Sequence, residues 1–171
     1  MAPSDRSPGH AAPRIIPMRS HARPEQDALT LRGTLGRVAA DVARSIHGLP
    51  TVTISLDVPD AHAADAAPEA VATPLRRLLE AACAAVVAPA PRGECPQMRE
   101  VLVTTVDTGA ALEIEVADSA ADVSRQEAAV AELRPLIERS GWTLSSAPCP
   151  DGGLAVTLRI PRRRGRSRAA A

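Results

Sequence analysis

The sequence contains no lysine: its twenty basic residues are all arginines, and twenty acidic residues balance them. The absence of lysine excludes a Walker-type phosphate loop and Schiff-base chemistry, because both need that side chain. The balanced charge leaves no overall field that would steer the chain toward nucleic acid or an anionic membrane. Tyrosine and phenylalanine are also absent, so Trp142 is the only aromatic residue. Stacking platforms for single-stranded nucleic acid are therefore excluded.

Cysteine is scarce, and long apolar runs are missing. Cys83, Cys95 and Cys149 form no C-x-x-C pair and have no histidine at ligand spacing, which argues against a structural zinc site or a disulfide framework. No apolar run approaches the roughly 20 residues of a membrane span, and the N-terminal residues lack the apolar stretch of a signal peptide. These features predict a soluble, cytoplasmic protein without membrane contact.

The length and composition suit one folded domain between two tails. A chain of 171 residues with 45% hydrophobic content can bury a core of its own. Residues 1–25 are rich in proline without periodicity and predict a disordered leader. Residues 26–161 are expected to form the domain. Residues 162–171 predict a basic disordered tail that is more often solvated than bound to phosphate.

The first half of the domain predicts two helices and a strand. Apolar residues at helical spacing over 31–46 indicate an amphipathic helix that ends before Gly48 and Pro50. Alternation over 52–58 indicates a strand with one buried face. After an alanine-rich loop, Thr73 and Pro74 are expected to be the cap and first position of a second helix, which stops before Pro89.

The second half predicts two hairpins around a third helix. Residues 100–106 and 111–117 alternate on either side of the turn "DTGA", and residues 143–146 and 154–160 flank "PCPDGG". Between them, Ser124 and Glu127 at capping-box spacing begin a helix that Pro135 should kink or split. The whole order predicts an α/β two-layer sandwich, with a mixed, mostly antiparallel sheet and helices on one face.

This order resembles the catalytic ATP-binding domain of bacterial sensor histidine kinases, a GHKL-type ATPase domain, over residues 28–161. "PEAVATPLRRLLEAACAAVVAPAPRG" is similar to the asparagine-box helix, and "LEIEVADSAADVS" to a strand followed by the first glycine box. "LRPLIERSGWTLSSAPCPDGGLAVTLRIP" resembles the closing helix and hairpin, whose Gly-Gly turn includes Gly152. The resemblance implies an ATP-binding fold of two-component signalling, with Gly152 near the nucleotide.

The asparagine box departs from the family pattern. The resemblance puts Glu80 at its acidic position and Ala84 at the magnesium-binding asparagine, or Ala85 if the register shifts by one residue. A methyl group offers no oxygen to magnesium, and without the ion phosphoryl transfer loses its main charge stabiliser. We therefore expect no magnesium site and no catalysis, with Glu80 as the one candidate catalytic residue.

The glycine boxes are also altered. Asp118 has the strand parity of Leu112, Ile114 and Val116, which aims its carboxylate at the helical layer. The resemblance implies the adenine amino group as its partner, whereas the alternative is a turn or capping aspartate. The glycine positions that follow hold Ala120, which resists glycine dihedrals, and the negatively charged Asp122.

Two further features depart from the family pattern: the glutamate at position 127 and the lack of a recognisable phosphoacceptor histidine. Glu127 stands in the second glycine box, where it competes with phosphate for a helix N-terminus. His10, His21, His47 and His62 lie in the leader, at a helix end or in a loop, and each is predicted to be solvated. We expect no autophosphorylation in cis.

Three hypotheses follow. The first is a degenerate, pseudokinase-type module that regulates another signalling protein in bacteria, with ATP binding weak or lost. The second is an active ATP-dependent protein kinase that acts in trans, of two-component or anti-sigma type. The third is an unrelated small α/β interaction domain. Because no dimerisation hairpin is recognisable, we expect a monomer or a weak complex.

Overall fold

The computed structural model describes residues 14–17, 30–46, 52–64, 66–88, 99–150 and 152–162. Its elements are β1 (Arg14–Pro17), α2 (Leu31–Ser45), β2 (Thr53–Asp57), α3 (Pro68–Val86), β3 (Glu100–Asp107), β4 (Ala111–Asp118), α4 (Ser124–Arg139), β5 (Thr143–Pro148) and β6 (Leu154–Pro161). None of the helices in these ranges is long and apolar enough to cross a membrane.

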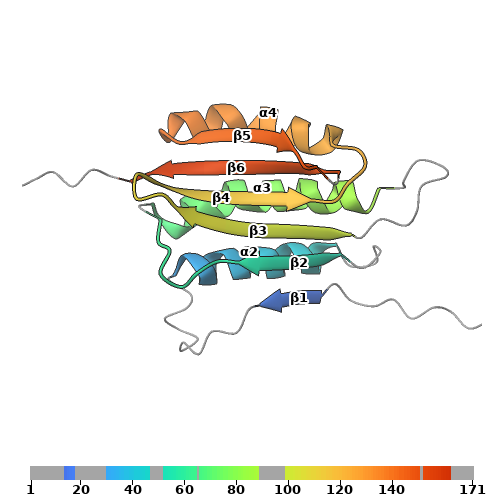
Figure 1. Cartoon of the computed structure of the whole chain (residues 1–171), viewed down its shortest axis with the longest axis horizontal. Coiled ribbons are helices and arrows are strands. Elements are labelled where there is room, and N and C mark those ends of the chain that lie inside the picture. Colours follow the sequence, from blue (N-terminus) through green and yellow to red (C-terminus); the bar gives the residue numbers. More distant parts are fainter. Residues whose placement is uncertain are drawn as a thin grey trace, which may run out of the picture.

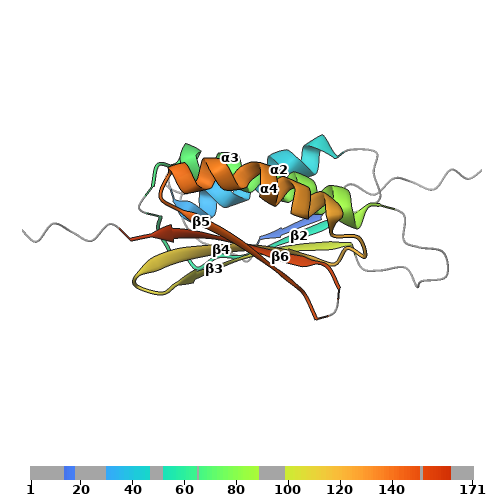
Figure 2. The ribbon, with the colours of Figure 1, turned by 90° about the horizontal axis from the view of Figure 1, so that it is seen from above.

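The strands form one mixed sheet in the order β1-β2-β3-β4-β6-β5 (Figure 1). The pairs β1–β2 and β2–β3 are parallel, whereas β3–β4, β4–β6 and β6–β5 are antiparallel. Helices α2, α3 and α4 all lie on one face of the sheet (Figure 2). The predicted two-layer α/β sandwich is confirmed.

The core lies between this face and the helices and is mainly aliphatic, with Cys83 inside it and Trp142 packed against it. Every second residue of β4 and β6 is buried, as the alternation predicted, and the stripes of α2, α3 and α4 cover them. The largest fully buried aliphatic side chains are Leu35, Ile54, Leu75, Leu79, Leu112, Ile114, Ile137, Leu158 and Ile160. Both predicted hairpins are present, so local alternation was sufficient to identify the antiparallel half of the sheet.

The strand β1 lies inside the segment predicted as a disordered leader. Arg14 to Pro17 pair in parallel with Thr53 to Leu56 of β2, so that prediction was wrong for these four residues. The pairing joins segments far apart in sequence, which a local pattern does not reveal. Proline at the end of an edge strand is compatible with such a ladder. The rest of the predicted leader, and the predicted tail after Arg162, lie outside the described residues.

Helix α3 begins earlier than predicted. Its first residue is Pro68, where the missing N–H costs nothing because the first turn has no intrahelical acceptor. Thr73 is not a cap, since its hydroxyl donates to the carbonyl of Glu69 inside the helix over 3.2 Å. Pro74 is buried within the helix rather than at its start. The true N-cap, Ala67, has no side chain that can accept a hydrogen bond, so the start gave no capping signal.

Helix α4 also differs at its start and its middle. Its N-cap is Val123 and no side chain caps it, so the predicted capping box of Ser124 and Glu127 was wrong. Instead, Oδ1 of Asp122 accepts from the Ser124 N–H over 2.9 Å. The helix runs unbroken through Pro135, because the apolar stripe on both sides of that residue remains packed on the core. The predicted split is therefore wrong.

Candidate functional site

Asp118 ends β4 with its side chain turned toward the helical layer, as strand parity predicted. It is 7% exposed, and Oδ1 accepts from the Ala120 N–H over 2.7 Å. Among the described residues, Oδ2 has no hydrogen-bond partner of normal geometry. Burial raises the pKa of this carboxyl above its ordinary value, and the N–H groups of Ala120 and Leu154 offset only part of that rise. One oxygen of Asp118 therefore stabilises the turn after β4, and the other is an acceptor without a hydrogen bond of normal geometry among the described residues.

The last hairpin packs directly against this aspartate. Gly153 has φ of +90°, and a Cβ added there would lie 1.9 Å from the carbonyl oxygen of Asp118. Glycine is thus required both for the conformation and for the close approach. The predicted nucleotide neighbour, Gly152, is exposed, and a Cβ there would meet nothing within 4 Å. Its binding role stays a prediction, whereas Gly153 is the glycine that shapes the site.

The loop after Asp118 contains the buried Ala120 and the exposed Asp122. Ala120 is 2% exposed, so its methyl group packs in the core. Its backbone N–H donates to Asp118. Asp122 is exposed, and its hydrogen bonds from Ser124 lower the pKa of its carboxyl. Both Asp122 and the exposed Glu127 are thus negative charges at the start of α4. This arrangement opposes a phosphate at that helix end.

The C-terminal half of α3 forms the other wall. Glu80 and Ala84 are one turn apart on the same half-buried stripe, whereas Ala85 is 3% exposed and packs in the core. Ala84 is therefore the less buried of the two alanines, and its alignment with the asparagine box stays a prediction. Burial raises the pKa of Cys83 to about 12, with the charges of Asp118 and then Glu80 adding to the effect. Helix α3 packs against β4.

Metal ligation has little support in this region. Within the described part of the chain, no group of three or more His, Cys, Asp and Glu side chains is arranged to hold a metal ion. The sequence contains no asparagine, and Gln126 is the only carboxamide side chain in the described ranges. Glu80 lines a groove between two helices and remains only a predicted replacement ligand.

Gln126 is a buried polar residue that the sequence reasoning missed. It is 2% exposed in the first turn of α4, and neither Nε2 nor Oε1 has a hydrogen-bond partner among the described residues. A buried amide left unpaired costs about 1–3 kcal/mol, so such groups normally have a partner. The signal was its spacing, since Gln126 continues the buried stripe of Val130, Leu133 and Ile137. A polar residue at a core-facing position is therefore a candidate for contact with a ligand.

A groove runs between α3 and α4 beyond this region, with a volume of about 420 Å³. We call it the α3–α4 groove. Its lining residues are Thr73, Arg77, Glu80, Ala81, Ala129, Glu132, Leu133 and Leu136. Leu136 is 41% exposed there.

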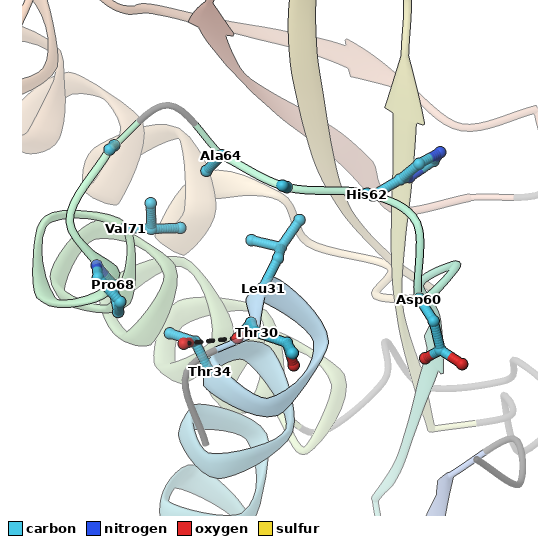
Figure 3. Close-up of a pocket in the computed structure, with 10 residues that line it drawn as sticks. Thr30, Leu31, Thr34, Asp60, His62, Ala64, Pro68 and Val71 are labelled. Carbon is cyan, nitrogen blue, oxygen red and sulfur yellow. Dashed lines mark hydrogen bonds between the residues drawn. The ribbon is translucent and has the colours of Figure 1, made fainter. Parts of the chain in front are cut away.

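A second hollow has a volume of about 280 Å³ (Figure 3). The register of β2, β3 and β4 puts it at the end of the sheet away from Asp118. The start of α2, the loop after β2 and the start of α3 surround it. His62 is half-buried here, with Nδ1 2.7 Å from Oγ1 of the buried Thr105, so the prediction of a solvated histidine was wrong for this residue. His10, His21 and His47 lie outside the described residues.

Comparison with known proteins supports the fold assignment. No family model matches the chain, and no curated protein matches its sequence. The catalytic domain of histidine kinase ThkA is similar in structure, with a TM-score of 0.62 and 13% identity over 77% of this chain and 93% of that chain. The ATP binding domain of PrrB from Mycobacterium tuberculosis has a TM-score of 0.56 and 24% identity, over 78% and 95%. The cytoplasmic segment of histidine kinase QseC has 0.55 and 16%, over 78% and 76%.

This chain therefore has the fold of the catalytic ATP-binding domains of histidine kinases, as the element order predicted. At these identities the likeness concerns the backbone arrangement, and the chemistry depends on the side chains described above.

Proposed function

We propose that this chain is a metal-independent module that binds the adenine base of a nucleotide, has lost phosphoryl transfer and regulates another signalling protein. The buried carboxylate of Asp118 carries the proposal, because Ala120 holds one oxygen and the other has no hydrogen bond of normal geometry among the described residues, with only the Leu154 N–H nearby. A buried acceptor without a partner favours a ligand that brings a donor. The exocyclic amino group of adenine is such a donor.

The second unpaired group supports a heteroaromatic ligand. Gln126 lies at the same end of the domain as Asp118, since α4 follows β4 after a loop of five residues. Its amide offers a donor and an acceptor, and both are unused among the described residues. A purine edge alternates donors and acceptors, so it complements a carboxylate and an amide together.

The loss of catalysis rests on the phosphate side of the site. Ala84, at the predicted asparagine-box position, has no oxygen for magnesium. Asp122 and Glu127 repel phosphate at the start of α4, where a nucleotide-binding helix usually attracts it. Binding energy must then come mainly from the base. A module that binds without turnover acts through its complex with another protein.

Isothermal titration tests this proposal with adenosine, ADP and ATP, each with magnesium and with EDTA. We expect adenosine to bind at least as well as ATP, with no effect of magnesium. Asp118→Asn should weaken binding about 10–100-fold, because one hydrogen bond to a charged group is worth about 1.5–3 kcal/mol. Asp57→Asn, an exposed aspartate at the end of β2, is the matched control and should bind normally.

Three results would contradict the proposal. Binding that requires magnesium would restore the metal-dependent kinase hypothesis. Absence of heat with all three ligands would leave an interaction domain without a nucleotide. Transfer of radiolabelled γ-phosphate to any protein, abolished by Glu80→Gln, would overturn the loss of catalysis.

A further inference from the structure

The α3–α4 groove has the chemistry to bind arginine side chains. Its lining combines apolar side chains with two carboxylates, Glu80 and Glu132, and one guanidinium, Arg77; the apolar residues are Ala81, Ala129, Leu133 and Leu136. An arginine buries its aliphatic stem on apolar surface while its guanidinium pairs with a carboxylate. A lysine or a purely apolar peptide would use only part of this lining.

An arginine-rich segment of the same chain starts next to the groove. Arg162 follows β6, where its N–H donates to the carbonyl of Ala110 over 2.9 Å and its guanidinium pairs with Asp107. It also lines a hollow of about 410 Å³ with Ala70, at the start of α3, and Ser140, at the end of α4. The residues that follow Arg162 read "RRGRSR" and contain Arg163, Arg164, Arg166 and Arg168.

The distances allow this segment to enter the groove. Ala70 and Thr73 are three residues apart on α3, so the groove begins about 4.5 Å along the helix from the hollow at Arg162. The groove extends from Thr73 to Ala81, about 12 Å along the helix axis. Residues 163–168 span up to about 20 Å when extended. The reach is therefore sufficient without movement of the domain.

The entrance itself is close to neutral. Helix α4 ends at Arg139 beside the hollow, and the positive charge of that residue offsets the partial negative charge of the last carbonyl groups. A chain that carries four positive charges past this end is attracted toward the two carboxylates beyond it. Because Arg77 opposes this attraction, the arginines must pair with Glu80 and Glu132 individually rather than respond to a broad acidic patch.

We propose that the arginine-rich segment 163–168 docks intramolecularly in the α3–α4 groove, with its guanidinium groups on Glu132 and Glu80. Docking covers the exposed Leu136 and occupies a surface that a protein partner would otherwise use. The segment is thus a built-in competitor for that partner. The proposal goes beyond nucleotide binding and does not depend on it.

Photo-crosslinking of the full chain tests the docking. Ser167 is replaced by p-benzoylphenylalanine, the protein is irradiated, and the crosslinked peptides are identified by mass spectrometry. We expect crosslinks to peptides of α3 and α4 that contain residues 73–81 or 129–136, within a single chain. Glu132→Arg should lower the yield at least about fivefold. Glu100→Arg makes the same charge change at an exposed position of β3, outside the groove and its entrance, and should leave the yield unchanged.

Other outcomes overturn the proposal. Crosslinks to another face of the domain, to a second chain or to nucleic acid would give the segment a different binding site. Equal yields in the two glutamate variants would show that the groove carboxylates do not hold it. Trp142 supplies an independent measurement, because it lines the hollow with Arg162. A chain that ends at Arg162 should differ from the full chain in Trp142 emission, and identical spectra would argue against docking.

Discussion

Replacing Asp118 by asparagine should stabilise the folded protein while it weakens ligand binding. An asparagine keeps an oxygen for the Ala120 N–H and removes the buried charge. Asparagine leaves an NH2 group unpartnered in place of the unpartnered oxygen, so the gain comes only from removing the buried charge, which costs about 1–3 kcal/mol more than a neutral polar group. A neutral acceptor binds the N–H less strongly than a carboxylate by about 1 kcal/mol. The expected net gain at pH 7 is about 1 kcal/mol, or roughly 2–4 °C in Tm.

The gain in stability from Asp118→Asn should be larger at neutral pH than at acidic pH. Burial raises the pKa of Asp118 in the folded protein above its ordinary value of 3.8. Between that value and the raised pKa, the unfolded chain binds fewer protons than the folded one, so the free energy of unfolding falls as the pH rises. Above the raised pKa the cost of the charge is present in full, and below about 3.8 it is absent. The difference between variant and parent should therefore shrink as the pH is lowered.

Urea denaturation followed by Trp142 fluorescence at pH 7 and pH 3.5 measures this difference. Asp107→Asn is the control with the opposite sign, because the Gly109 N–H and then Arg162 lower the pKa of Asp107 in the folded protein. That variant should lose stability at pH 7 and lose less at pH 3.5. A destabilised Asp118→Asn variant, or an equal difference at both pH values, would refute the reasoning and indicate that the carboxylate has a partner.

Three further substitutions or modifications test the packing. Gly153→Ala should lower the free energy of unfolding by more than about 3 kcal/mol, because φ is +90° and the added Cβ would clash with the backbone of Asp118. Gly109→Ala should lower it by only about 1 kcal/mol in the same denaturation assay, because φ is +74° but nothing lies within 4 Å of the added Cβ. Pro135→Ala should stabilise by about 1–2 kcal/mol, because the exposed middle of α4 regains an N–H donor, and an unchanged denaturation midpoint would contradict this. Cys83, with a pKa of about 12, should resist iodoacetamide at pH 8 while the half-buried Cys149 reacts, and equal rates by mass spectrometry would show that α3 opens readily.

Much of the fold could be predicted because its signals are local. Strand alternation identified both hairpins, and the parity of Asp118 correctly aimed its carboxylate at the helices. The strand β1 was missed because only its pairing with β2 defines it. The start of α3 was missed because Ala67 offers no capping side chain, and Pro74 was the more conspicuous signal.

The candidate site was predictable only in part. Asp118 could be found because a carboxylate at a buried strand position is unusual. Gln126 was overlooked because its own residue type does not suggest burial, although its helical spacing does. The role of Gly153 depends on the closeness of β6 to the end of β4, which no spacing in the sequence shows. Features that arise from contact between distant segments therefore needed the structure.

The two halves of the sheet differ in how far apart along the chain their paired strands lie. Strands β3–β4 and β5–β6 are joined by short turns, whereas β1, β2 and β3 come together only across intervening helices. Closing a short loop costs less chain entropy, so the turn-linked pairs should form early in folding and the β1 edge should join last. In the native state this gradient should appear as amide protons that exchange with solvent slowest in β4 and β6 and fastest in β1.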